Sequence, residues 1–199
     1  DKGNTISIDG YPELKPQDIT IPKDPSSAAF PICAGLIVKD SKIFLDSVCQ
    51  NPTRNGLLET LMEMGARIEI KNSREINGET VADLSIESSN LRGVDVPPAR
   101  AVSMIDEYPI LSIAASCAEG KTVMDGISEL RVKESDRIKI VSNGLIKAGV
   151  KTIEKAESLT IYGSKVVGGC SIDSELDHRV AMSFLILGLI SKEPIKVLR

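Results

Sequence analysis

Residues 131–137 read Arg-Val-Lys-Glu-Ser-Asp-Arg and place five charges of both signs in seven positions. A run of this kind usually forms a solvated face. From Ile138 onward, however, apolar residues recur at spacings of three, four and three, which predicts an amphipathic helix over 135–147. Extending its apolar face back by one turn reaches Glu134, so this carboxylate should lie at the mouth of a cleft, with Arg137 on nearly the same face.

The charged side chains of this motif favour a bound anion. An acid in the first turn, such as Glu134, is explained by the positive end of a helix alone. Lys133 and Arg137 are not, because a helix start disfavours cations unless an anion is bound there. We therefore interpret Lys133 and Arg137 as ligand-binding groups and Glu134 as a group that can transfer protons.

A second predicted helix start also carries cations. His178 and Arg179 follow Asp177 at the beginning of an apolar segment. One interpretation is structural: His178 caps the helix and Arg179 pairs with Asp177 or Asp173. The other is functional, because backbone N–H groups together with a guanidinium are the usual cradle for phosphate or carboxylate. Cations at two separate helix starts favour a polyanionic ligand.

Asp106 opens a further apolar segment. It is interpreted either as a helix N-cap or as a general base that takes a proton from a substrate hydroxyl. Asp24, at the equivalent place earlier in the chain, has no cation cluster beside it and is interpreted as a cap, and Arg54 as a structural or surface residue. One histidine and four cysteines without C-x-x-C spacing form no recognised zinc site, so no metal is expected.

The apolar segments belong to an internal repeat. Each unit has an Asp, an apolar helix, a small turn and a β-rich run; the first two units continue into an amphipathic helix and further strands. The units span roughly 10–97, 98–170 and 171–199, and the last stops where its second helix is due. We expect an α/β (α+β) fold, a pseudo-threefold inverse α/β prism of β-α-β-α-β-β units with helices inside and sheets outside. The helix starts should share one electropositive end.

Composition limits the classes of function. The 199 residues carry a net charge of -4 and suit one globular domain over 1–199. Three Phe, three Tyr and no Trp leave little for base stacking, so nucleic acid is not an expected partner. The most apolar run, 180–190, is too short to span a bilayer and is interpreted as a buried helix. Four thiols without disulfide spacing favour a reducing, cytoplasmic location.

Taken together, these motifs closely resemble the 5-enolpyruvylshikimate-3-phosphate synthase family over nearly the whole chain. The most specific parts are 131–137 and Leu176-Asp-His-Arg-Val-Ala-Met-Ser183. Support comes from 24–30, 51–54 and 103–109. They look most like the bacterial subclass that includes glyphosate-tolerant members.

The resemblance implies an architecture and a reaction. Members of the family fold as two domains of three units each, and the chain resembles the C-terminal one, so the N-terminal domain would be missing. The family transfers the enolpyruvyl group of phosphoenolpyruvate to the 5-hydroxyl of shikimate 3-phosphate through a tetrahedral intermediate and releases phosphate. No cofactor is implied, and a monomer is expected at full length. We expect the chain alone to fold at least partly without turning over.

The resemblance also implies roles for individual residues. Asp106 corresponds to the base that accepts the 5-hydroxyl proton, and Glu134 to the group that delivers and removes a proton at the methylene carbon. Lys133 is similar to the family residue that contacts shikimate 3-phosphate and the reacting centre. Many members carry Asn where this chain has Glu129, which puts a side-chain amide contact there in question.

The implied contacts to the donor come from the two helix starts. Arg137 and Arg179 resemble the pair that clamps phosphoenolpyruvate, with His178 close by. Two alternatives remain at this point. A UDP-N-acetylglucosamine enolpyruvyl transferase shares the fold and donor but lacks the Lys-Glu-Ser-Asp-Arg arrangement. A non-catalytic anion-binding domain is the other.

Overall fold

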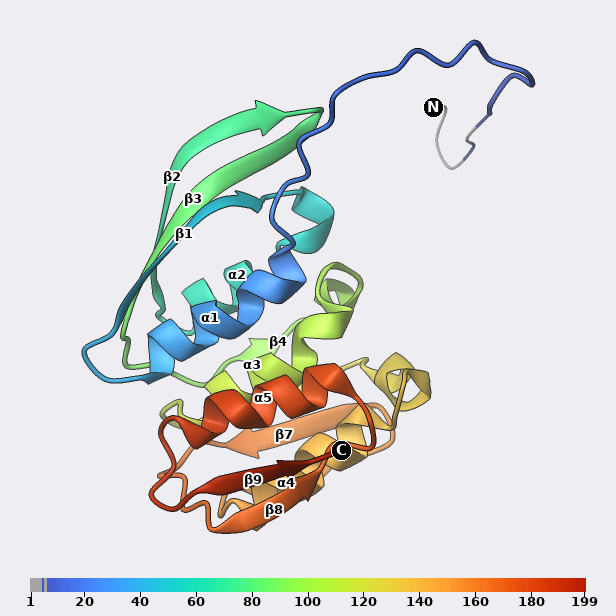
Figure 1. Cartoon of the computed structure of the whole chain (residues 1–199). Coiled ribbons are helices and arrows are strands. Elements are labelled where there is room, and N and C mark those ends of the chain that lie inside the picture. The colour runs from blue at the N-terminus through green and yellow to red at the C-terminus, as the bar shows by residue number, and fades with distance from the viewer. Residues whose placement is uncertain (1–4, 6) are drawn as a thin grey trace.

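The computed structural model describes residue 5 and residues 7–199. Three helices, α1, α3 and α5, lie between a three-stranded sheet on one side and a four-stranded sheet and a two-stranded pair on the other (Figure 1). In chain order the helices and strands are α1 (Pro25–Ile37), β1 (Lys42–Cys49), α2 (Gly56–Glu63), β2 (Arg67–Ile76), β3 (Glu79–Glu87), β4 (Asp95–Val96), α3 (Tyr108–Ser116), β5 (Lys121–Asp125), α4 (Arg137–Lys147), β6 (Lys151–Glu154), β7 (Ser158–Tyr162), β8 (Cys170–Asp173), α5 (His178–Gly188) and β9 (Ile195–Leu198). Four short 3-10 helices join them: η1 (Pro52–Arg54), η2 (Pro98–Ser103), η3 (Ile105–Glu107) and η4 (Ser128–Val132).

The middle of the chain follows the order β4, α3, β5, α4, β6, β7, which is the expected β-α-β-α-β-β pattern. Its strands form one sheet in the order β4-β5-β7-β6, parallel only between β4 and β5. Parallel neighbours require a crossover, and α3 supplies it. Although β4 lies inside the range 10–97, it pairs with the strand that follows α3. A two-residue strand carries no periodic signal, so its place could not be read from the sequence.

The flanking parts of the chain repeat this order in reduced form. Before α1, a single parallel bridge from Lys23 to Val48 takes the place of a first strand. The following strands form an antiparallel sheet in the order β1-β3-β2. At the other end, β8 and β9 pair in parallel around α5. Each repeat therefore begins with a parallel connection through one central helix.

The central helices pack on one another because their surfaces are apolar. All nine residues of α3 are buried, and α3 contacts both α1 and α5. One connected hydrophobic core joins these helices to both larger sheets. Helices inside and sheets outside, as expected from the sequence, are confirmed.

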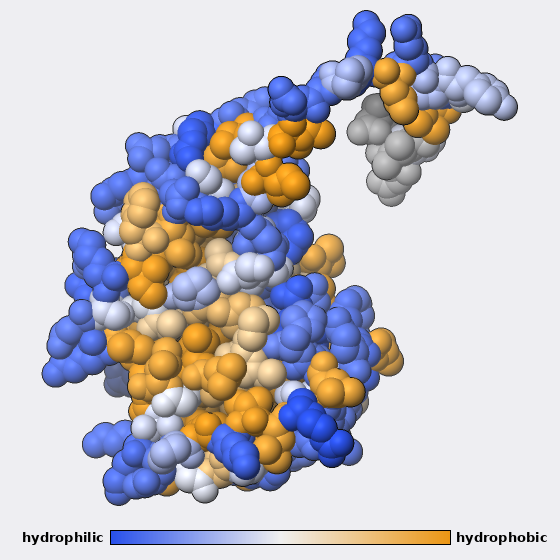
Figure 2. Space-filling model, in the orientation of Figure 1, coloured by the Kyte–Doolittle hydropathy of each residue, from blue (hydrophilic) through white to orange (hydrophobic). Residues whose placement is uncertain are grey.

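One helix departs from that expectation. The run 180–190 was expected to be buried, but α5 is buried on one side only, and Leu185 and Leu189 are 57% and 59% exposed. Apolar side chains gather on the face of the molecule where Figure 1 draws α5 (Figure 2). The central helix of the middle unit differs in its neighbours, because α3 contacts α4 and β7 in addition to α1 and α5.

Candidate active site

The aspartates at the central helix starts do not all have the same role. Asp24 and Asp177 are N-caps, and each accepts two backbone N–H groups of the first turn of α1 or α5. Asp106 lies in η3, before α3, and its side chain caps neither helix. The cap interpretation of Asp106 is therefore wrong, because the intervening 3-10 turn moves the helix start to Tyr108 and leaves the carboxylate to pair with arginines.

Arg137 is the centre of the site. Its Nε donates to Asp177 Oδ2 at 2.8 Å, Nη1 to Asp106 Oδ1 at 2.9 Å and Nη2 to Glu134 Oε2 at 2.5 Å. The guanidinium side chain is only 1% exposed. A single buried cation thus gathers carboxylates from η3, from the loop before α4 and from the start of α5, and the outermost two, Asp106 and Asp177, are 71 positions apart in the sequence.

The loop that carries Glu134 differs from the prediction. The helix begins at Arg137, two residues later than the expected Ser135, because the Asp136 side chain accepts Lys139 N–H and caps it there. Glu134 therefore lies in a bend rather than on a helical face, and its side chain is 52% exposed. Proximity of Glu134 to Arg137 follows from the loop conformation, not from helical phase.

A second arginine fixes this loop. Both nitrogens of one edge of the Arg131 guanidinium reach the β6–β7 turn: Nε donates to the Ala156 carbonyl at 2.8 Å and Nη2 to the Lys155 carbonyl at 2.5 Å. Nη1 donates to both carboxylate oxygens of Asp136, at 3.0 and 2.8 Å. The charged motif therefore divides into two groups. Arg131 and Asp136 hold the loop, while Glu134 and Arg137 face the site.

Arg179 completes the cluster from α5. Its Nη2 lies 3.7 Å from Asp106 Oδ2, and its Nη1 lies 4.0 Å from Glu107 Oε1. In the described part of the chain, the Arg179 side chain pairs with neither Asp177 nor Asp173, so the structural interpretation of Arg179 is wrong. Asp177 instead accepts the backbone N–H of Arg179. Asp106 thus bridges two arginines that come from different helices.

Three residues of this end were not identified from the sequence. Glu107 is 4% exposed and accepts a hydrogen bond from Ser26 Oγ, which in turn accepts from Arg54 Nη2 at 2.7 Å. Arg54 also lies 4.0 Å from Glu107, so it faces the site and not only the surface. No local sequence pattern predicts the contact between Ser26 and Glu107, which are 81 positions apart. The one signal in the sequence was that Glu107 directly follows Asp106.

Lys133 and His178 lie at the edge of this network. The Lys133 ammonium donates to Glu129 Oε1, four residues earlier, instead of pointing at Asp106. Glu129, upstream of the charged motif, thus pairs with the motif's own lysine. His178 is the first residue of α5 and is exposed. The structure brings together Asp106, Glu134, Arg137 and Arg179 and leaves these two outside.

Carboxylates pair with the arginines at the end of the molecule where the central helices begin. This end is therefore not simply electropositive, as was expected from the sequence. Burial alone would raise the pKa of Asp177, but the Arg137 guanidinium and the backbone of α5 outweigh it and hold that pKa below its ordinary value. Burial raises the pKa of Glu107, because the Ser26 hydroxyl and the more distant arginines offset desolvation only in part. The site therefore favours the ionised form of Asp177 and the neutral form of Glu107.

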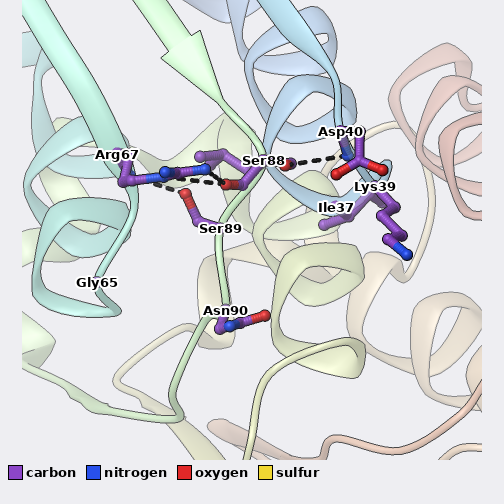
Figure 3. Close-up of a pocket in the computed structure, with 9 residues that line it drawn as sticks. Ile37, Lys39, Asp40, Gly65, Arg67, Ser88, Ser89 and Asn90 are labelled. Carbon is purple, nitrogen blue, oxygen red and sulfur yellow. Dashed lines mark hydrogen bonds between the residues drawn. The ribbon is translucent and has the colours of Figure 1, made fainter.

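Other features of the described residues lie elsewhere. A pocket at the far end of α1 is lined by Ile37, Asp40, Arg67 and Ser88, among others, and contains none of the predicted site residues (Figure 3). There Arg67 donates to the Ser88 carbonyl at 3.1 Å. Within 5 and 7–199, no cluster of three potential metal ligands was found, and no helix is long and apolar enough to cross a bilayer.

Comparison with known proteins identifies relatives of this chain. The family model "EPSP synthase (3-phosphoshikimate 1-carboxyvinyltransferase)" matches residues 1–199. A 3-phosphoshikimate 1-carboxyvinyltransferase of Cereibacter sphaeroides is 54% identical over 98% of the chain and 44% of its own length. One from a Chelativorans species is 55% identical over 96% of the chain and 43% of its own length. The chain thus spans less than half the length of these relatives.

Solved structures agree. EPSP synthase from Acinetobacter baumannii superimposes with a TM-score of 0.90 at 38% identity, covering 98% of this chain and 47% of that one. An enolpyruvyl transferase from Streptomyces tendae, at 17% identity and a TM-score of 0.66 over 86% of this chain, shares the fold. On the family match over its whole length and on these relatives, the chain belongs to the EPSP synthase (3-phosphoshikimate 1-carboxyvinyltransferase) family.

Proposed function

We propose that the protein to which this chain belongs transfers the enolpyruvyl group of phosphoenolpyruvate to the 5-hydroxyl of shikimate 3-phosphate and releases phosphate. The observation that carries the proposal is the shared network of Asp106, Glu134, Arg137 and Arg179. Two guanidinium groups beside two carboxylates supply both anion recognition and proton transfer in one place. Family membership over residues 1–199 supports the same reaction.

The roles follow from the chemistry of the two half-reactions. In the addition, Asp106 takes the proton of the 5-hydroxyl while that oxygen bonds to C2 of phosphoenolpyruvate, and Glu134 gives a proton to C3. In the elimination, Glu134 removes a proton from C3, the carbon–carbon double bond re-forms and phosphate leaves. Arg137 and Arg179 hold the anionic donor through both steps. Every step uses side chains and substrate alone.

Lys133 and His178 have supporting roles in this proposal. Lys133 sits on the same loop as Glu134 and reaches shikimate 3-phosphate once it leaves Glu129. His178 stands next to Arg179 at the start of α5. The four free cysteines support a reducing cytoplasmic location for a protein that we infer to be monomeric at full length.

The described residues form one wall of the site. Glu134 and Asp106 are 52% and 36% exposed, which leaves their outer sides open to a partner domain. We infer that residues 1–199 form one globular domain and that the length missing relative to the family supplies the other wall. The chain alone is then expected to fold without turning over, since the ligand contacts of the other wall are absent.

Substitutions in a polypeptide of the relatives' length that carries this chain test the assignment. Glu134→Gln and Asp106→Asn keep shape and remove the proton acceptor, so kcat should fall by about 10²–10⁴. Glu157→Gln, on the exposed turn before β7, is the matched control for loss of charge and should leave kcat unchanged. Full activity in both site variants would reject the proposed roles and favour a non-catalytic anion-binding domain.

A further inference from the structure

The charges around Arg137 exceed what one guanidinium can balance. Among the described residues, three carboxylates form ion pairs with it, and Arg179 adds a second cation at 3.7 Å from Asp106. Another anion placed against Arg137 would meet repulsion from all three. A ligand oxyanion can therefore bind Arg137 only if one carboxylate gives up its place.

The three carboxylates differ in how firmly they are held. Asp177 is fully buried, accepts a hydrogen bond from Ser135 Oγ at 3.0 Å and caps α5 with its other oxygen. Asp106 is shared between Arg137 and Arg179. Displacing either would break several contacts at once.

Glu134 is held much less firmly. Among the described residues, its carboxylate has one ion-pair partner, Arg137, and its side chain is 52% exposed. It stands in a bend, where no helical hydrogen bond fixes its backbone. Moving Glu134 outward would uncover Nη2 of Arg137. Of the three carboxylates that contact this buried guanidinium, Glu134 has the most exposed side chain.

We propose that a ligand oxyanion binds Arg137 by replacing the Glu134 carboxylate, so that occupation of the anion site releases Glu134 for proton transfer. The identity of that oxyanion as part of phosphoenolpyruvate rests on the proposed function; the exchange itself rests on the geometry. Arg137 and Asp177 stay in place, and Glu134 swings into the open side of the site.

The exchange couples donor binding to chemistry. Before the ligand arrives, the Glu134 carboxylate accepts a hydrogen bond from Nη2 of Arg137. Once an oxyanion has taken that place, the Glu134 side chain is free to reach the methylene carbon of the substrate, where it can transfer a proton. The site thus acquires its proton donor when the donor substrate is bound.

Inorganic phosphate is the probe that tests this on the chain itself. The NMR signals of the Arg137 side chain, followed while phosphate is added, give the dissociation constant of phosphate. Glu134→Gln should bind phosphate about tenfold more tightly than the unmodified chain, because no charge-assisted hydrogen bond has to be broken first. Glu175→Gln removes the same charge from the exposed loop before α5 and should change the affinity by less than about twofold.

Equal or weaker phosphate binding by Glu134→Gln would overturn the exchange, and so would the lack of saturable binding by that variant. Glu134→Ala, with no amide to contact Arg137, should shift affinity in the same direction and guards against a defect specific to Gln. In the unmodified chain the Glu134 carboxyl ¹³C signal, identified by its loss in Glu134→Gln, should move as phosphate saturates; a static signal contradicts the proposal. None of these readouts depends on turnover, so failure of the proposed function would appear separately, as full activity of Glu134→Gln.

Discussion

Arg137 is both a ligand-binding candidate and a structural residue. It is the largest fully buried side chain in the described part of the chain, and it neutralises a buried Asp177. Arg137→Met should therefore lower the free energy of unfolding by about 3–5 kcal/mol, because Asp177 is left charged without a partner. Urea unfolding measures this. Arg179→Met, which removes longer contacts, should cost less than about 1 kcal/mol; equal losses in both variants would contradict the structural role of Arg137.

Glu107 gives the site a dependence on pH that a Gln variant should remove. Its pKa is raised by burial above the ordinary 4.5, so its protonated form stabilises the fold below that value, and this stability is lost as the pH rises through the raised pKa. Glu107→Gln mimics the protonated form. Relative to the unmodified chain, its free energy of unfolding should increase as the pH goes from about 4 to about 7.

Asp177→Asn provides the comparison of opposite sign. The folded pKa of Asp177 lies below the ordinary 3.8, so its contribution is present above that value and is lost as the pH falls through the lowered pKa. The Asn variant should be less stable than the unmodified chain near neutral pH and approach it in acid. Urea unfolding over the same pH series measures both, and parallel curves for either variant would contradict the assigned pKa direction.

At the residue level, the charged motif was informative because its types and spacing are unusual for a helix start. It predicted that Glu134 and Arg137 face the site, and the internal repeat predicted that Asp106 and Arg179 lie at the same end. It could not predict Glu107 or Arg54, whose contacts depend on how distant units meet. The charge pattern of a local motif can be recognised in the sequence, whereas contacts such as those of Ser26 with Glu107 and Arg54 require the fold.

At the scale of elements, the packing of α4 against α5 can be tested through glycine. A Cβ on Gly144 would lie 2.2 Å from Cζ of Phe184, whose ring is fully buried. Gly144→Ala should therefore lower the free energy of unfolding by about 1–3 kcal/mol, although Ala alone favours helix by about 1 kcal/mol. Thermal or urea unfolding measures the change.

Gly188, at the end of α5, is the matched control for that substitution. Its nearest neighbour to an added Cβ is Ile195 Cβ at 3.9 Å, an ordinary contact. Gly188→Ala should be neutral or stabilise the fold by up to about 0.5–1 kcal/mol. Stabilisation by Gly144→Ala, or an equal loss in both variants, would show that the α4–α5 contact does not limit the space.

Element type was predictable wherever periodicity was strong. The central helices and the alternating strands matched expectation, while the starts of α3 and α4 did not. Both errors have a local cause: η3 precedes α3, and the cap that Asp136 provides makes α4 begin at Arg137 and not at Ser135. Competing caps and 3-10 turns shift a helix start by a few residues without altering the apolar pattern.

For the molecule as a whole, the exposed face of α5 is the main feature that sequence could not supply. Periodicity identified an apolar helix, but how much of it is covered depends on neighbouring elements. We expect the chain to bind a hydrophobic dye such as ANS, because Leu185 and Leu189 are half exposed on one face. A Leu185→Glu/Leu189→Glu double variant should lose most of the dye fluorescence.

Two controls accompany this prediction: the free energy of unfolding of the double variant, and a substitution at an exposed apolar residue away from α5. The double variant should change the free energy of unfolding by less than about 0.5 kcal/mol per site, as for other surface substitutions. Val102→Glu, at an 88% exposed residue of η2, should leave dye binding unchanged. Equal dye fluorescence in all three proteins would place the apolar surface elsewhere than on α5.

The most direct test of the account is steady-state phosphate release from phosphoenolpyruvate and shikimate 3-phosphate, measured for this chain and for a polypeptide of the relatives' length that carries it. We expect turnover by the longer polypeptide, dependent on shikimate 3-phosphate and not supported by UDP-N-acetylglucosamine, and no turnover by the chain alone. Release by the chain alone at the rate of the longer polypeptide would contradict the claim that its Arg137-centred cluster is one wall of a shared active site.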